Sequence, residues 1–421
     1  MSSGDVAPWL SQSRWPTVPI RYVAKLGTGH TPSRQRPDYW KNCTIPWMTL
    51  ADVWQLRDGT RNTVAETKEK ISQLGLVNSA AVLHPAGTVM LSRTASVGFS
   101  AIMGIDMATS QDFATWTCGP KLHSRFLLHA LRAMAPDLRR VAAGSTHKTI
   151  YMPDIEQLRI PLPSVEEQRR IADFLDAETA RLEKVVTIIR RQIELIDLRE
   201  ESLLHEFTDL VNVPSVQVKH VVAKLTSGPR GWGDLVADSG VPFLRITNVP
   251  RRGISLLLDD LLFVDAPPGP ERERTRTRSG DVLISITADI GSVGVVEGEV
   301  VGGNVSQHIA LLRPVQQICL SRWLAYTLRA PAANQALKTS SYGGTKIGLG
   351  LNEVAQVVIP LPDLSVQSRY VNMIDSALAS AAACRTVLEK KLILLSERRQ
   401  ALITAVVTGR IDVTTARGIV G

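Results

Sequence analysis

The most regular pattern of hydrophobic and polar positions is a seven-residue repeat in two long stretches that contain neither Gly nor Pro. Each stretch is about 45 residues long, and apolar residues at every seventh position are typical of helices that pair as a coiled coil. We expect one long helix in each stretch. The positions that should pair the helices and dock partners are Leu175, Leu182, Ile189, Ile196 and Leu203 in the first stretch and Leu388, Leu395 and Leu402 in the second.

A wider apolar stripe accompanies the first repeat. Ile171 and Val185 fill neighbouring core positions, and Val186, Ile193 and Phe207 lie beside them. A two-stranded seam needs fewer apolar positions than this, so the helices should also contact other helices, either in a bundle or on a partner. A stalk that only separates two domains is the alternative.

The rest of the chain has the short hydrophobic runs of an α+β fold. Runs such as "TVMLS" (Thr88–Ser92) and "DVLISI" (Asp281–Ile286) are rich in β-branched and aliphatic residues and are bounded by Gly and Pro, as strands are. The prolines of "IPLPS" and "IPLPD" prevent each long helix from extending upstream, and Ser164 or Asp363 can cap its first turn. Each helix therefore follows a compact α+β domain.

The two halves of the chain repeat one another. "IPWMTLADV" (45–53) matches "VPFLRITNV" (241–249), and "SQDFA" (110–114) matches "SQHIA" (306–310), both at a separation of 196 positions. "RIPLPSVEEQRRIADFLD" matches "VIPLPDLSVQSRYVNMID" at a separation of 199 positions. This period far exceeds the roughly 20–50 residues of solenoid repeats. Each copy should therefore be a whole domain with its helix, giving a pseudo-twofold internal repeat.

The composition favours a soluble, cytoplasmic protein with a polyanionic partner. The formal net charge is +8 and the sequence pI is about 9.4, which suits DNA, RNA or an acidic protein. No apolar run reaches the roughly 18–20 residues of a membrane span, and the first residues lack the blocks of a secretion signal. The four cysteines are far apart, which predicts reduced thiols without a metal.

No motif of a catalytic site is found. In "DAPPGP" (265–270) the prolines are misplaced for a methyltransferase [DN]PP[YFW] motif, and no aromatic residue follows to stack on a flipped base. The glycines of "GSVGVVEGEVVGG" (291–303) lack the Lys of a P-loop, and neither HExxH nor a nucleophile elbow occurs. We therefore expect no catalytic and no metal-ligating residues. A stand-alone DNA-modifying enzyme with an unrecognised site and a coiled-coil protein scaffold remain as alternatives.

The order, spacing and duplication of these segments together resemble one family. "TASVG" (94–98) and "TADIG" (287–291) each follow a predicted strand, and "LITAVVTGRIDV" (402–413) closes the second helix. With "IPLPSVEEQRRIADFLD" (160–176), they are similar to recurrent segments of the specificity subunits of type I DNA restriction-modification systems. The resemblance covers nearly the whole chain.

The resemblance implies both a fold and a function. The fold would be α+β, with two similar globular target-recognition domains separated by two long, antiparallel coiled-coil helices. Each domain would read one half of a bipartite target in double-stranded DNA, and the helices would set the spacer and dock methyltransferase subunits. The implied segments are target-recognition domain 1 (1–163), a central long helix (164–210), target-recognition domain 2 (211–362) and a C-terminal long helix with its tail (363–421).

The chemistry would then belong to the partners. The chain would be a non-catalytic subunit that binds no cofactor itself. Two methyltransferase subunits would carry S-adenosylmethionine. A restriction subunit, where one exists, would use ATP and Mg²⁺.

Candidate DNA contacts lie in the matched loops. Arg and Lys suit phosphates, Asn, Gln and Arg suit base edges, and Gly turns allow the backbone to approach closely. The candidates are Arg34, Arg36, Ser92, Arg93, Thr94, Gln111, Thr146 and Lys148 in the first domain and Arg230, Arg245, Asn248, Ser285, Thr287, Gln307, Tyr342, Thr345 and Lys346 in the second.

Several of these interpretations have a structural alternative. Arg93, Lys148, Arg230 and Lys346 could equally be ordinary surface charges. Trp47 and Phe243, at matched positions, are expected in the core rather than against bases. The run "ERERTRTR" (271–278) is either a strand edge that contacts phosphates or a solvated loop.

Overall fold

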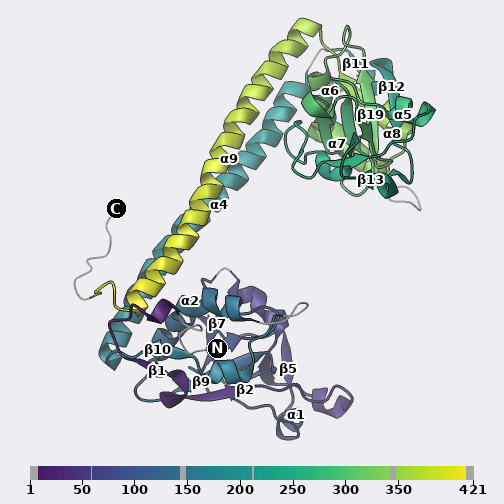
Figure 1. Cartoon of the computed structure of the whole chain (residues 1–421). Helices are drawn as coiled ribbons and strands as arrows, with labels where there is room; N and C mark the ends of the chain where they lie inside the picture. Colours follow the sequence, from purple (N-terminus) through teal and green to yellow (C-terminus); the bar gives the residue numbers. More distant parts are fainter. Residues whose placement is uncertain (1–7, 58, 143–147, 211–212, 342–347, 414–421) are drawn as a thin grey trace. The chain divides into compact units, whose positions relative to one another are not determined.

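The computed structural model describes residues 8–57, 59–142, 148–210, 213–341 and 348–413 (Figure 1). The chain divides into two compact units. Unit 1 is Met1–Arg190 with Lys390–Gly421, and unit 2 is Arg191–Glu389. Each unit contains one globular domain with the adjoining part of both long helices, so its residues come from separate parts of the sequence.

Unit 1 is built on a five-stranded sheet. Its strands lie in the order β2 (Ala24–Thr28), β9 (Phe113–Cys118), β6 (Val89–Ser92), β7 (Ser100–Met103) and β4 (Thr63–Val64). All neighbours are antiparallel except β7 and β4. A three-stranded sheet has the order β5 (Glu69–Ile71), β3 (Ile45–Met48) and β8 (Ala108–Thr109), and β1 (Thr17–Pro19) pairs with β10 (Arg159–Pro161).

The described part of the unit 1 domain contains three α-helices besides short 3-10 helices, and one long helix leaves it. They are α1 (Gln73–Val77), α2 (Ser124–Val141), α3 (Met152–Glu156) and the long helix α4 (Val165–Thr208). The apolar face of α2 packs on the central strands, where Phe126, Leu127 and Leu131 are fully buried. This domain–helix order is the one that the sequence pattern predicts.

Unit 2 repeats the order of the matched strands, without a counterpart of β4 and with one additional strand in its second sheet. Its main sheet has the order β12 (Val222–Ser227), β19 (Ile309–Pro314), β16 (Val282–Ser285) and β17 (Val293–Val295). The second sheet is β13 (Val236–Ala237), β15 (Leu262–Val264), β14 (Val241–Leu244) and β18 (Asn304–Val305), and β11 (Ser215–Gln217) pairs with β20 (Val358–Pro360). Its helices are α5 (Pro270–Thr275), α6 (Ser321–Arg329), α7 (Pro331–Ser341), α8 (Leu351–Gln356) and the long helix α9 (Leu364–Val407). The duplication inferred from the sequence therefore extends to the order of the strands.

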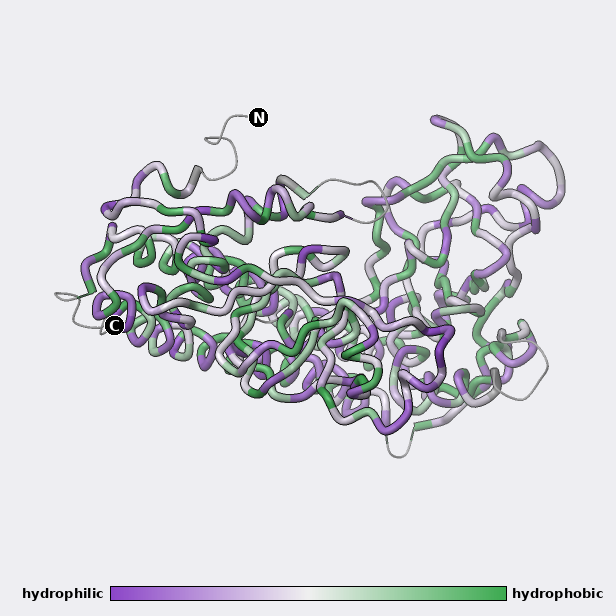
Figure 2. Tube along the Cα trace, turned by 90° about the horizontal axis from the view of Figure 1, so that it is seen from below, coloured by the Kyte–Doolittle hydropathy of each residue, from purple (hydrophilic) through white to green (hydrophobic). Residues whose placement is uncertain are grey.

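The hydrophobic residues form a core in each domain. Trp47 and Phe243 are 2% exposed, which confirms that these matched aromatic residues belong to the core. Figure 2 shows hydrophobic segments spread through both units rather than gathered in one long run. No helix in the described part of the chain is long and apolar enough to cross a membrane.

The two long helices pack against each other within each unit (Figure 1). In unit 1, Ile171 and Leu175 near the start of α4 share a core with Ile403 and Val406 near the end of α9. In unit 2, Leu204 near the end of α4 shares a core with residues 371 and 374 near the start of α9. The helices therefore run antiparallel.

The predicted heptad positions line this contact. Leu175, Ile189 and Leu388 are buried, and Leu182, Ile196, Leu203, Leu395 and Leu402 are half-buried. Val185 is 44% exposed, so its assignment to the seam was wrong. The seam turns the adjacent Val186 inward instead, because the two residues point about 100° apart on a helix.

Ion pairs cross between the helices beside the apolar seam. Arg385 of α9 donates to Asp197 at 2.7 Å and to Glu200 at 2.8 Å, both on α4. Glu200 is only 5% exposed, and such a buried carboxylate needs a paired cation. In unit 1, Arg399 of α9 lies 3.9 Å from Glu183 of α4.

The substitution Ile189→Asp should weaken helix pairing strongly. Ile189 is 6% exposed, and an unpaired charge at a buried position costs about 3 kcal/mol or more. The neighbouring Ile188 is 59% exposed, so Ile188→Asp adds the same charge without burying it. Thermal unfolding followed by circular dichroism should show a large fall in Tm for Ile189→Asp alone. Equal melting of both variants would contradict this seam.

Candidate nucleic-acid interface

The candidate loops of unit 1 emerge at one edge of the five-stranded sheet. β2 ends at Thr28 and β6 ends at Ser92, which pairs with Phe113 at the start of β9. Because β9 runs antiparallel to both, two strand ends and one strand start meet at this edge. The backbone N–H of Ala95 donates to the carbonyl of Lys148 at 2.8 Å, which brings a fourth segment there.

Unit 2 gathers the matching loops in the same way. β12 ends at Ser227 and β16 ends at Ser285, which pairs with Ile309 at the start of β19. The backbone N–H of Leu349 donates to the carbonyl of Ile286 at 2.8 Å, so the segment before α8 also reaches this edge. Each copy therefore presents loops from distant parts of its sequence on one surface.

Both copies have the same unusual turn at this edge. "TASVG" joins β6 to β7 and "TADIG" joins β16 to β17. Ala95 and Ala288 have φ values of 56° and 46°, and Gly98 and Gly291 have φ values of 90° and 86°. A non-glycine residue in this region costs about 1–3 kcal/mol, so the surrounding hydrogen bonds must hold the turn. The glycine N–H donates to the carbonyl of the last residue of the preceding strand at 3.0 Å in unit 1 and 3.1 Å in unit 2.

Two glycines allow a close backbone approach beside these turns. A Cβ atom on Gly29 would lie 1.8 Å from the carbonyl oxygen of Thr109, and one on Gly228 would lie 1.9 Å from that of Val305. No side chain fits at either position. The glycine framework of the predicted loops is therefore a packing requirement that both copies share.

In unit 1, aromatic rings and a polar pair hold predicted contact residues at the surface. The guanidinium of Arg34 lies 3.9 Å from the ring centroid of Trp40 and donates to Glu69 at 2.7 Å. Stacking fixes the plane of the guanidinium, and its N–H groups lie in that plane. Gln111 accepts a hydrogen bond from Thr31 at 2.7 Å. Arg36 lies over another ring, with 5.4 Å between its guanidinium carbon and the Tyr39 centroid.

In unit 2, a polar cluster occupies the corresponding edge. The hydroxyl of Thr287 lies 3.0 Å from Nδ1 of His308, and Nε2 of Gln307 lies 3.0 Å from Nε2 of the same ring. This cluster combines donors and acceptors, as reading base edges requires. His308 lies in the candidate segment "NVSQH" (304–308) but was not named as a contact residue, although it directly follows Gln307 in the matched segment.

Three of the predicted contact residues are buried inside the domain instead, and two of them have hydrogen bonds there. Ser92, Asn248 and Ser285 have no exposed surface. The Asn248 side chain accepts from the N–H of Arg245 at 2.8 Å and donates to the carbonyl of Leu257 at 2.9 Å. The Ser285 hydroxyl donates to the carbonyl of Thr287 at 3.0 Å. Short polar side chains beside turns cap the backbone as readily as they contact a ligand, so residue type does not separate the two roles.

The other candidates differ in whether their side chains already bind other parts of the domain. Arg93 donates to the carbonyls of Gln111 and Ile150 at 3.0 and 3.3 Å, and Arg245 forms an ion pair with Asp260 at 2.7 Å. These two arginines hold loops together. Lys148 and Arg230 are exposed, and Thr94 is half-buried. The remaining candidates, Thr146, Tyr342, Thr345 and Lys346, lie outside the described residues.

A buried glutamine joins each long helix to its domain. Oε1 of Gln168 accepts from the N–H of His123 at 2.8 Å, and its Nε2 donates to two backbone carbonyls. Gln367 makes the same three contacts, accepting from Leu320 N–H at 2.9 Å. Both residues are fully buried. "EEQ" and "SVQ" thus share the one residue that this junction requires.

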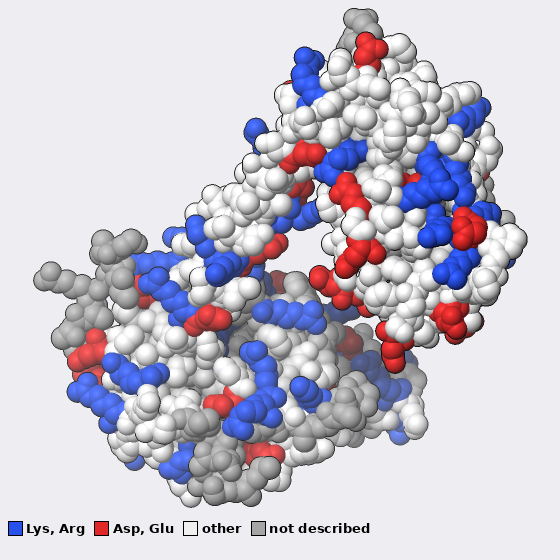
Figure 3. Space-filling view, turned by 45° about the horizontal axis from the view of Figure 1, so that its top comes forward, with Lys and Arg blue, Asp and Glu red and all other residues white. Residues whose placement is uncertain are grey.

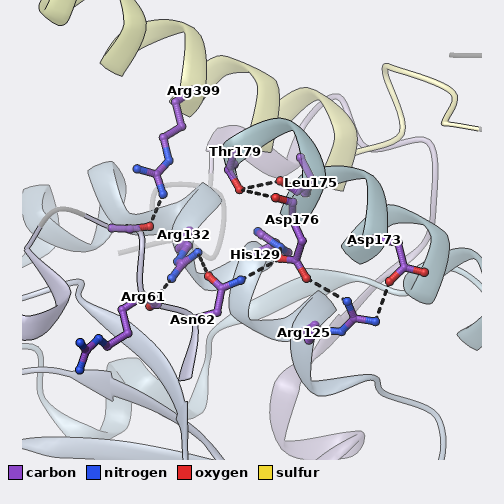
Figure 4. Close-up of polar contacts among 11 residues, drawn as sticks. Arg61, Asn62, Arg125, His129, Arg132, Asp173, Leu175, Asp176, Thr179 and Arg399 are labelled. Atoms are coloured by element: carbon purple, nitrogen blue, oxygen red, sulfur yellow. Dashed lines mark hydrogen bonds and ion pairs between the residues drawn. The ribbon is translucent and has the colours of Figure 1, made fainter. Parts of the chain in front are cut away.

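About two turns further on, an aspartate of each long helix binds the neighbouring domain helix. Figure 4 shows Asp176 between Arg125 at 2.9 Å, His129 at 2.8 Å and Asn62 at 2.9 Å. At the equivalent place in unit 2, Asp375 accepts from Arg322 at 2.8 and 3.0 Å and from the hydroxyl of Tyr326. Sequence reasoning missed both anchors, although the matched "FLD" and "MID" segments contain the two carboxylates.

Comparison with known proteins now identifies the duplicated domain. A family model described as "Type I restriction modification DNA specificity domain" matches residues 12–194 and 271–389, which is more than half of the chain. The chain belongs to this family. The earlier resemblance is therefore confirmed.

Curated relatives agree. The specificity subunit of the type I restriction enzyme EcoKI from Escherichia coli (strain K12) is 23% identical over 94% of this chain and 89% of its own length. The EcoBI subunit from Escherichia coli is 22% identical over 69% of this chain, and the MjaIX subunit from Methanocaldococcus jannaschii is 24% identical over 57%. These last two alignments span 66% and 54% of the relatives' own lengths.

Solved structures show the same fold. A chain of a type I R-M system, solved to explain complex assembly and conformational transition, matches with a TM-score of 0.75 and 20% identity. The alignment covers 94% of this chain and 98% of that chain. The HsdS subunit from Thermoanaerobacter tengcongensis matches with a TM-score of 0.52 and 20% identity, covering 94% and 97%. The predicted α+β fold with two similar domains and two long paired helices is confirmed.

Burial sets the charge states in the anchor of unit 1. It lowers the pKa of His129 by more than the hydrogen bond to Asp176 raises it, so the imidazole is neutral near pH 7. Burial alone would raise the pKa of the Asp176 carboxyl. The contacts with His129 and Arg125 outweigh burial and lower that pKa. Asp176 is therefore ionised near pH 7 and pairs with Arg125, which also contacts Asp173.

Lowering the pH should destabilise unit 1 through His129. The pKa of His129 is lower in the folded chain than in the unfolded chain, so the unfolded chain binds more protons once the pH falls below about 6.5. The free energy of unfolding then falls by up to about 1.4 kcal/mol per pH unit. His129→Tyr copies Tyr326 of unit 2 and should reduce this slope in thermal unfolding between about pH 5.5 and 7.5. His84 and His123, whose pKa values burial also lowers, remain in both proteins. An unchanged slope would contradict this assignment.

Proposed function

We propose that this chain is the non-catalytic DNA-reading subunit of a type I restriction-modification complex, with one half of a bipartite duplex target read by each unit. The observation that carries the proposal is the duplicated edge. The two copies share strand order, the left-handed alanine turn and the close-approach glycines, whereas the side chains at the edge differ. One scaffold with two sets of contacts suits a target whose halves have different sequences.

The long helices have a second role in this proposal, because they set the spacer between the half-sites and dock methyltransferase subunits. Support comes from large apolar side chains that the seam leaves exposed. They are Val185, Ile188, Leu195 and Leu198 on α4, and Met373, Val387, Ile393 and Leu394 on α9, with exposed fractions of 44–61%. Exposed apolar patches on helices mark surfaces that bind other proteins.

The partners would supply all the chemistry. Two methyltransferase subunits would bring S-adenosylmethionine, and a restriction subunit would bring ATP hydrolysis and Mg²⁺. The cytoplasm, where the chromosome is accessible, is the compartment in which this role is expected. Among the described residues, no group of three or more His, Cys, Asp or Glu side chains could hold a metal ion. A stand-alone DNA-modifying enzyme and a protein scaffold are the competing functions.

Exchange of one domain tests the proposal directly. Replacing residues 216–362 with those of a relative of different specificity should change one half of the methylated motif and leave the other half unchanged, because each domain has its own core. Methylome sequencing of host DNA with and without the chimera gives the readout. Methylation of DNA by the purified chain alone would favour the enzyme. If every methylated motif remains after the gene is deleted, the scaffold would be favoured.

The docking surface can be tested apart from helix pairing. Ile188→Asp with Leu195→Asp places two charges on the exposed stripe and should abolish co-purification with the methyltransferase subunit, since desolvating an unpaired charge costs several kcal/mol. The Tm of the isolated chain should change by little. Ile188→Met with Leu195→Met, which changes the same two positions but keeps the stripe apolar, is the control. Normal complex formation by the double variant would place the docking surface elsewhere.

A further inference from the structure

A basic surface lies on the side of unit 2 formed by α5 and the edge strand β12. Its cations come from "ERERTRTR" and from two neighbouring strands. Figure 3 shows Lys and Arg side chains gathered on the part of unit 2 where these elements lie. We call the following residues the basic strip: Lys224, Arg272, Arg274, Arg276, Arg278 and Arg313.

The backbone directs these arginines outward. The segment is not one strand, as we had considered, because Pro270–Thr275 forms α5 and an extended stretch follows it. Thr275 at the end of α5 and Thr277 in the extended stretch are buried, whereas Arg274, Arg276 and Arg278 are exposed. The Thr277 hydroxyl donates to the carbonyl of Val300 at 2.7 Å, which fixes the alternation.

The three nearby carboxylates, Asp281, Glu271 and Glu273, neutralise the six cations of the strip only in part. Asp281 is buried and accepts two bonds from Arg313, both at 2.7 Å. Glu271 lies 4.0 Å from Arg274 and Glu273 lies 3.7 Å from Arg276. The two arginines are 42% and 55% exposed, and exposed ion pairs of this kind contribute little to stability. Burial and the proximity of Arg313 and Arg278 lower the pKa of Lys224, which indicates crowded positive charge.

The strip is continuous with the recognition edge of unit 2. Arg274 donates to the carbonyl of Ser227 at 2.8 Å and to the hydroxyl of Thr226, at the end of β12. Asn304 donates to the carbonyl of Arg272 at 2.8 Å, three residues before the polar pair Gln307 and His308. DNA held at the recognition edge would therefore pass close to the strip.

Unit 1 has no equivalent strip at the matching positions. There α1 takes the place of α5 and exposes Leu74 and Val77, which are 48% and 65% exposed. Lys25 matches Lys224, but its strand partner is Thr117 where Lys224 has Arg313. The charge difference between the copies lies on a framework that they share, so folding alone does not require it.

We infer that the basic strip binds the sugar-phosphate backbone of duplex DNA beside the half-site read by unit 2, giving that unit a sequence-independent share of the affinity that unit 1 lacks. This inference rests on the proposed function. Arginine and lysine bind phosphates without reading bases, and each neutralised phosphate adds about 0.9 to the slope of log K against log salt.

The test uses the full-length chain, with its methyltransferase subunit, and fluorescence anisotropy of labelled duplexes between about 50 and 200 mM KCl. The variant is Lys224→Gln, Arg276→Gln and Arg278→Gln, which spares Arg274 and Arg313 because they hold loops. The matched control, Lys25→Gln, Lys390→Gln and Lys391→Gln, removes equal charge from exposed positions of unit 1.

We expect the strip variant to lose about two to three units of salt slope and about tenfold or more in affinity, equally for duplexes with and without the target. The methylated motif should stay the same, and Arg276→Lys with Arg278→Lys should keep the wild-type slope. If the triple variant melts early, Lys224→Gln and Arg278→Gln alone should each remove about one unit.

The outcomes separate the two claims. If the strip variant and the control variant have the same slope of log K against log salt, the inference that the basic strip binds DNA is wrong. Loss of methyltransferase binding at an unchanged slope would assign the strip to an acidic protein surface and would also overturn it. Failure of the wild-type complex to bind any duplex would sink the proposed function itself.

Discussion

The return of the last helix into the first domain is the contact on which the rest of the structure depends. Val406 and Val407 of α9 are fully buried in the core of unit 1, beside Leu175 of α4. Full burial of one such side chain is worth about 1.5–3 kcal/mol, so unit 1 needs the far end of the chain to complete its core. Because α4 leaves the same core that α9 enters, the helices must run in opposite directions. The antiparallel pair follows from where the helix ends are buried.

Charge then favours this helix partner over others. The cross-helix arginines, Arg385 and Arg399, lie on α9, and the carboxylates that they approach lie on α4. The two helices match at a separation of 199 positions, so Arg399 corresponds to Glu200. If one α4 paired with another α4 in the same register, Glu200 would meet Glu183 where Arg399 does now. A like-charge contact at this half-buried position is unfavourable, whereas the apolar seam alone would not distinguish the helices.

The sequence could predict the features that depend on periodicity and repetition. It could predict less of the features that depend on which residues a side chain contacts in the fold. The heptads identified the seam because burial recurs at a fixed interval, and the repeat identified two equal domains. The prediction that Val185 lies in the seam was wrong because heptad spacing does not show how far around the helix a seam extends. Asn248 failed because an amide beside a turn has the same appearance whether it caps the backbone or faces solvent. Asp176 and Asp375 were missed because their partners lie about 50 positions away in sequence.

Differences between the copies can therefore be sorted by what constrains them. Gln168 and Gln367 make the same three buried bonds, and a change at either would leave backbone groups unsatisfied, so folding itself keeps these positions alike. No such constraint acts on the exposed faces of α1 and α5, where Leu74 and Val77 of one copy occupy positions that match a run of arginines in the other. Where packing demands nothing, folding does not account for a difference in charge between two copies of one framework. The half-buried polar residues at the recognition edges satisfy the same condition, since their framework is shared and their side chains are not.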